Sequence, residues 1–141
     1  MRGNEQMNPM EEYKKPLTKE FSLGEHKVIL RTLNSKELET IEKDITFKLA
    51  NFSTSAVYQI KKIEILSRSI VSIDGISLKQ FENIQSEIST SENPDLLKII
   101  RKEIESWDST VTDIMYSYYN LLMEEKGKQF KKELDFLNAQ N

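Results

Sequence analysis

The segment from Val111 to Met123 places the strongest constraint on how this chain can fold. Its apolar side chains recur at helical spacing and, at about 100° per residue, cover an arc of roughly 220°. A surface helix usually buries an apolar face only a little wider than ~100°. The helix is therefore either central to the domain, with tyrosine hydroxyls reaching the surface, or it buries a second face against a partner. The apolar positions are Val111, Ile114, Met115, Tyr116, Tyr118, Tyr119, Leu121, Leu122 and Met123.

A short β segment precedes the helical part of the chain. Apolar and polar residues alternate in Phe21–Leu23 and again in His26–Leu33, with Gly24-Glu25 between them, which predicts a two-stranded hairpin. A hairpin of this size is marginal alone, so it must pack on helices or add to another sheet.

Helical periodicity begins at Asn34. Asn34 and Glu37 have the spacing of a capping box, in which each side chain bonds to the backbone N–H of the other residue. Ser53 is a second helix-start signal and predicts another helix after it.

A tight turn is predicted near the middle of the chain. Asp74-Gly75 lies between two isoleucines, and glycine accepts a positive φ without a Cβ clash. A miniature hairpin at this turn would pair with the first hairpin and give a small mixed sheet. Ser77–Gln80 has capping-box spacing and predicts that a further helix starts there.

Helical patterns fill the rest of the chain. One helix restarts at Pro94 and carries Trp107, Asp108-Ser109 interrupts the pattern, and a long helix follows as far as Gly127. The predicted fold class is mainly α (α+β), a helical domain with a small N-terminal β-hairpin and a mid-chain Asp-Gly turn. We expect residues 1–16 to form a mobile arm, 17–141 a single α-rich domain, and 127–141 an extended C-terminal helix.

The residue types offer little chemistry for catalysis. The 141-residue chain has no cysteine and one histidine, His26, and its carboxylates alternate with lysine and arginine, as on a solvated helix face. We therefore expect no enzyme activity, catalytic residue, cofactor or metal site. The net charge of −3 argues against a nucleic-acid partner. No apolar run approaches the ~20 residues that span a bilayer, and no signal peptide is visible, so we expect a cytoplasmic protein without a membrane partner.

Three motifs occur in order between about residues 20 and 125. A strand ends in Val28–Leu33 and a helix start follows at once, a helix ends in Ile65–Gly75, and an aromatic helix covers Val111–Leu122. In this order they resemble small tail-assembly proteins of tailed bacteriophages, including tail assembly chaperones and baseplate-hub assembly proteins. In that group a strand end of the form R-x-L precedes a helix, an I-d-G turn lies mid-chain, and a Y-x-x-L helix comes late.

The resemblance implies a non-enzymatic protein of phage tail morphogenesis that acts in the cytoplasm of the infected host cell. Its partners would be other tail or baseplate proteins, such as an aggregation-prone tape-measure protein. An arm, an exposed hairpin edge and a very apolar helix are all suited to capturing a partner. The residues expected at the contact are Trp107, Tyr116, Tyr119 and Met123, with Phe21 and Leu23 on the hairpin edge.

Two alternatives remain open. A structural subunit retained in the virion tail, neck or baseplate would associate stably with itself as an oligomer or with other subunits. A small helical regulatory or DNA-associated protein would need a basic face, which the mixed charge pattern disfavours.

Overall fold

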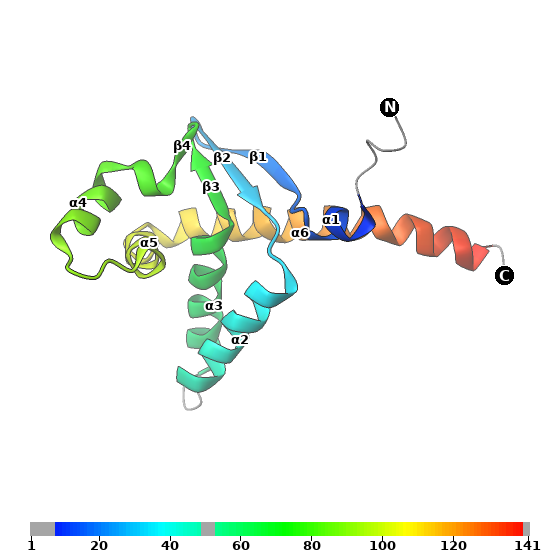
Figure 1. The fold of residues 1–141 in the computed structure, drawn as a ribbon, viewed down its shortest axis with the longest axis horizontal. Coiled ribbons are helices and arrows are strands. Elements are labelled where there is room, and N and C mark those ends of the chain that lie inside the picture. The colour runs from blue at the N-terminus through cyan, green and yellow to red at the C-terminus, as the bar shows by residue number, and fades with distance from the viewer. Residues whose placement is uncertain (1–7, 49–52, 140–141) are drawn as a thin grey trace.

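The computed structural model describes residues 8–48 and 53–139. A four-stranded sheet with the order β1-β2-β3-β4 lies beside a larger set of helices (Figure 1). The mainly α (α+β) fold class is therefore confirmed. The strands are β1 (Thr18–Leu23), β2 (His26–Arg31), β3 (Ile70–Ile73) and β4 (Ile76–Ser77). The helices are α1 (Pro9–Lys14), α2 (Ser35–Lys48), α3 (Thr54–Ser69), the 3₁₀ helix η2 (Leu78–Gln80), α4 (Glu82–Thr90), α5 (Leu96–Glu105) and α6 (Ser109–Ala139).

Both hairpins close through two-residue turns. Gly24 has a φ of 62°, whereas Asp74 and Gly75 have φ values of 52° and 79°, which is the backbone of a type I′ turn. The two hairpins pair as predicted, with Val28 opposite Ile73. The sheet is antiparallel throughout rather than mixed, because α2 and α3 return the chain so that β3 runs against β2.

Helix α6 is the central helix of the domain. It packs against α3 on one side and against β1 and β2 on another. Met115, Tyr119 and Leu122 are buried in the core together with Val28 and Leu30 of the sheet. The wide apolar arc of this segment is thus explained largely by burial within the chain itself.

Ion pairs tie the helices together where their contacts are partly polar. The Glu64 carboxylate on α3 accepts hydrogen bonds from Arg68 at 2.9 Å and from Arg101 on α5 at 2.6 Å. The buried Lys62 side chain of α3 bonds to Asp113 of α6. These pairs fix the positions of α5 and α6 relative to α3.

Three expectations about helix boundaries are wrong. The helix expected to restart at Pro94 begins at Leu96, because the Asp95 side chain caps it by accepting from the Lys98 N–H at 3.2 Å. Ser77 makes no capping bond with its side chain, because it belongs to β4 and pairs with Ser72, and α4 begins only at Glu82 after η2. Helix α6 runs through Gly127 without interruption, so the segment after it continues the same helix.

Part of the segment expected to form an N-terminal arm is helical in the structure. Helix α1 lies within residues 1–16, and its Tyr13 ring packs edge-to-face against Phe130 of α6, with ring centroids 6.1 Å apart. Residues 1–7 lie outside the described residues. None of the helices described is both long enough and apolar enough to cross a bilayer.

Candidate protein-contact site

The structure does not bring the six predicted contact residues together. Tyr119 is only 3% exposed and belongs to the core, and Tyr116 is half-buried between Tyr119 and Tyr58 of α3. Burial raises the pKa of Tyr119 to about 12. Met123 lies about one turn after Tyr119 on α6, where it lines a cavity next to α1.

The hairpin edge is also largely engaged within the chain. Phe21 stacks on Tyr118 of α6 with ring centroids 4.5 Å apart, and Leu23 packs against the core. In the antiparallel pair of β1 and β2, the backbone N–H and C=O groups of Thr18, Glu20 and Ser22 face away from β2. The Tyr118 hydroxyl donates to the outward-facing Ser22 carbonyl at 2.7 Å. This leaves a short stretch of β1 open for an added strand.

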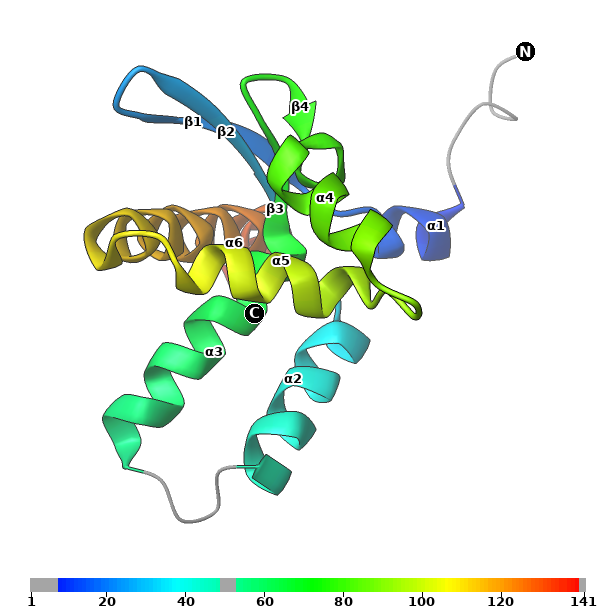
Figure 2. The same ribbon diagram turned by 90° about the vertical axis from the view of Figure 1, so that its left-hand side faces the viewer.

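Trp107, by contrast, lines a well-formed groove. The groove has a volume of about 200 Å³ and lies between β3, η2, α4 and α5. Figure 2 shows α4 above α5, next to β3 and β4. Four of its aliphatic lining side chains are buried in the core, and its two aromatic lining residues, Phe81 and Trp107, are partly buried. The lining residues are Ile73, Leu78, Phe81, Asn83, Ile84, Ile100, Glu103, Ile104 and Trp107.

Local sequence explains how Trp107 reaches this position. Helix α5 ends at Glu105, and the Trp107 backbone N–H still bonds to the Ile104 carbonyl at 3.0 Å. Asp108 then caps the next helix by accepting from the Thr110 N–H at 2.8 Å. The indole is therefore held at the corner between two capped helices.

A carboxylate of the groove lining holds the indole in place. Glu103 accepts a hydrogen bond from the Trp107 indole N–H at 2.7 Å through one oxygen, and from the Asn83 amide at 3.3 Å through the other. Among the described residues that line the groove, Glu103 alone carries a charge. The lining is therefore apolar except for the Asn83 amide and the Glu103 carboxylate.

The size of this groove limits what it can hold. Sites for small-molecule ligands and cofactors usually have volumes of roughly 300–1,000 Å³. A groove of about 200 Å³ is smaller, and its scale suits one large apolar side chain of another protein. Interface anchors of this kind fill well-packed pockets and contribute most of the binding energy.

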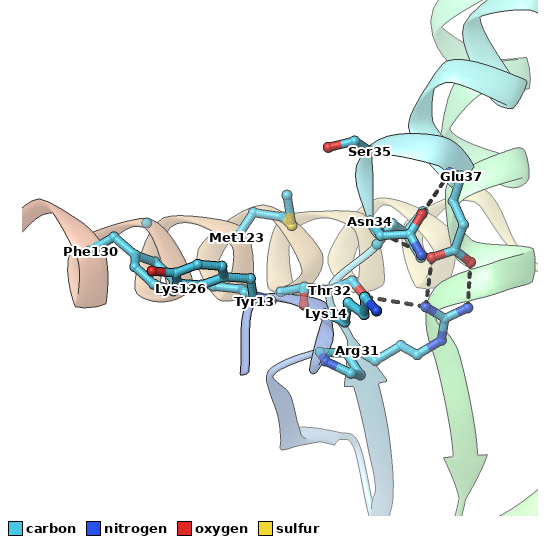
Figure 3. A pocket seen from close by; sticks show the side chains of 13 residues that line it. Tyr13, Lys14, Arg31, Thr32, Asn34, Ser35, Glu37, Met123, Lys126 and Phe130 are labelled. Atoms are coloured by element: carbon cyan, nitrogen blue, oxygen red, sulfur yellow. Dashed lines mark hydrogen bonds and ion pairs between the residues drawn. The ribbon is translucent and has the colours of Figure 1, made fainter. Parts of the chain in front are cut away.

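A second cavity, of about 390 Å³, lies where α1, the β2–α2 connection and α6 meet (Figure 3). Arg31 donates to both oxygens of Glu37, at 3.0 and 2.7 Å, and Glu37 also accepts from the Asn34 N–H at 3.0 Å. The hydrogen bond from Arg31 holds the pKa of Glu37 below its usual value, and the same bond raises the pKa of Arg31. Both charges are satisfied within the chain, so this cluster anchors the start of α2.

His26 lies away from both cavities, at the hairpin turns, where its Nδ1 contacts the Asp74 carboxylate at 2.5 Å. Within residues 8–48 and 53–139, no group of three or more histidine, aspartate or glutamate side chains is placed to hold a metal ion.

Sequence reasoning selected Trp107 but missed the residues that complete its groove. Phe81, Asn83 and Glu103 were not singled out as contact residues, and the groove exists only because η2, α4 and α5 fold against one another. One local signal was present, since Glu103 and Trp107 are four residues apart and therefore neighbours on a helical turn.

Comparisons of the chain with models of known protein families, with curated proteins and with solved structures find no match.

Proposed function

We propose that this protein is a non-enzymatic factor of phage tail morphogenesis that binds another tail or baseplate protein through the Trp107 groove. The observation that supports binding is the groove itself, which is lined by buried aliphatic side chains, two partly buried aromatic rings and one carboxylate. The assignment to tail assembly rests on the resemblance of the three sequence motifs. The protein would act in the cytoplasm of the infected cell.

The groove defines the chemistry of its occupant. Its volume and apolar lining suit a single large aliphatic or aromatic side chain. The Glu103 carboxylate favours a lysine or arginine close to that side chain in the partner sequence. The partner segment would therefore combine one apolar anchor with a neighbouring positive charge.

A charge placed at the groove mouth tests this site. Asn83 is exposed on α4, so Asn83→Lys should leave the fold intact while repelling a cationic partner segment and removing the amide bond to Glu103. Ser89→Lys is the matched control, because it adds the same charge to an exposed position near the C-terminal end of α4, about 120° from Asn83 around the helix. Only Asn83→Lys should lose the partner in affinity purification from infected cells.

Mass spectrometry of purified particles and of the infected-cell lysate tests the assembly role. An assembly factor is expected in the lysate, in complex with a tail protein, and not in finished particles. A fixed copy number in particles would instead identify a retained structural subunit. Absence of any tail or baseplate protein from the lysate complex would contradict the proposed function.

A further inference from the structure

The C-terminal half of α6 extends beyond the rest of the domain. Figure 1 shows this part of the helix passing α1 and continuing toward the C-terminus with no other labelled element beside it. Helix α6 has 31 residues, and the buried core positions described on it end at Leu122. Among the described side chains of α6, which end at Phe130, the buried core thus extends only as far as Leu122.

In this second half of α6, the broad apolar arc of Val111–Met123 gives way to a single narrow row of apolar residues. Methionine, glycine, phenylalanine and two leucines follow one another at alternating spacings of four and three residues, which is the pattern of a helix-pairing seam. Gly127 lies within this seam, and a Cβ added to it would meet no atom within 4 Å. The seam positions are 123, 127, 130, 134 and 137.

Helix α1 covers this seam only loosely. No residue of α1 is buried, and the contacts described are the Tyr13 ring on Phe130 and a hydrogen bond from Lys126 to the Lys15 carbonyl at 2.8 Å. Cavities of about 390 and 370 Å³ flank α1 where it meets α6. The chain's own α1 therefore leaves space along this face of α6.

We propose that two copies of the chain pair through the C-terminal halves of their α6 helices, in antiparallel orientation. With Phe130 of one copy opposite Gly127 of the other, Met123 of one copy falls opposite position 134 of the other. Each of these contacts occurs twice in the dimer, and a two-fold axis relates its two copies. The large Phe130 ring is then matched to the smallest residue of the partner helix. The second helix takes the place of α1 on the seam.

Charges beside the seam select the antiparallel orientation. In this register Glu124 of one copy flanks Lys131 of the other, and Lys126 flanks Glu133, so each flank carries opposite charges. A parallel pair would instead bring Lys126 beside Lys131 and place like charges together. The occupant is thus a second copy of this chain, and the inference does not depend on the Trp107 groove.

A charge swap tests the pairing. We expect sedimentation velocity to show a concentration-dependent dimer for the unaltered chain. Glu124→Lys and Lys131→Glu each place like charges together twice per dimer, so each alone should weaken association about tenfold or more. An equimolar mixture of the two variants should restore the dimer, because every flanking contact in the mixed pair is again attractive.

Restoration of the dimer in the mixture would distinguish a loss of contacts between two copies from an effect of each substitution within its own chain. Positions 124 and 131 are seven residues apart, about 10.5 Å along the helix, too far for a direct ion pair in the monomer. Circular dichroism must show both variants folded, and Lys126→Glu with Glu133→Lys repeats the test on the other flank. A chain that stays monomeric at all concentrations, or variants whose mixture does not associate better than either alone, would overturn the proposal.

Discussion

Replacing Glu64 by glutamine should destabilise the protein by about 2 kcal/mol at neutral pH. The Glu64 side chain is 8% exposed and lies between Arg68 and Arg101, which are 10% and 20% exposed. Removing one member of a buried ion pair commonly costs about 3–5 kcal/mol, because the remaining charge is left without its partner. The two arginines retain some access to water and glutamine keeps one acceptor, which reduces the expected cost to about 2 kcal/mol.

The effect should depend on pH in a defined direction. Burial alone would raise the pKa of Glu64, but the hydrogen bonds from Arg101 and Arg68 outweigh it and lower the pKa below 4.5. A carboxylate whose pKa is lower in the folded state contributes stability above its unfolded pKa and loses it as the pH falls through the folded pKa. The difference between the unaltered chain and Glu64→Gln should therefore shrink below about pH 4.5.

Urea unfolding followed by far-UV circular dichroism measures this difference. With a slope near 2 kcal/mol per molar urea, the midpoint at pH 7 should fall by about 1 M. Glu87→Gln is the control, because Glu87 forms an exposed pair with Lys102 at 3.8 Å and should shift stability by less than about 0.5 kcal/mol. Equal effects of the two substitutions, or a Glu64 effect that is unchanged at low pH, would refute the reasoning.

Three further predictions concern single residues. His26 should titrate by NMR with a pKa above 6.5 because of its hydrogen bond to Asp74, and Asp74→Asn should lower that pKa. The stabilisation from the charged His26–Asp74 pair should be lost as the pH rises through the pKa of His26 in the folded protein. The Tyr119 hydroxyl is buried and no described residue offers it a hydrogen-bond partner, so Tyr119→Phe should raise the unfolding free energy by about 1 kcal/mol. Tyr118→Phe removes the hydrogen bond to the Ser22 carbonyl and should lower the unfolding free energy by a similar amount in the same urea assay. Asn34→Ala should cost about 1 kcal/mol through loss of the α2 cap, and an unchanged thermal midpoint would contradict this.

Local signals in the sequence predicted several elements correctly. Asn34 and Glu37 form the reciprocal bonds of a capping box, at 2.8 and 3.0 Å, and the Ser53 side chain accepts from the Ala56 N–H at 3.3 Å. Asp74 and Gly75 form the predicted tight turn. These features depend on residues a few positions apart, which is why pattern and spacing reveal them.

Features that depend on tertiary packing could not be predicted in the same way. Ser77 has a capping-box spacing, but pairing with β3 draws it into the sheet. The apolar arc of α6 had two interpretations, and only the positions of α3 and the sheet show that Tyr119 lies in the core. The groove around Trp107 depends on Phe81 and Asn83, whose approach to Glu103 no spacing rule predicts.

Photo-crosslinking from position 81 tests the central claim most directly. Phe81 forms part of the groove wall, and a benzoyl-phenylalanine at this position keeps an aromatic ring there while it reacts with whatever occupies the groove. In infected cells that are assembling particles, we predict a crosslink to a tail or baseplate protein, at a segment with an apolar residue beside a lysine or arginine. The same probe at position 89, an exposed position near the C-terminal end of α4 that does not line the groove, should give no such product. No crosslink from position 81, or the same product from both positions, would contradict the account.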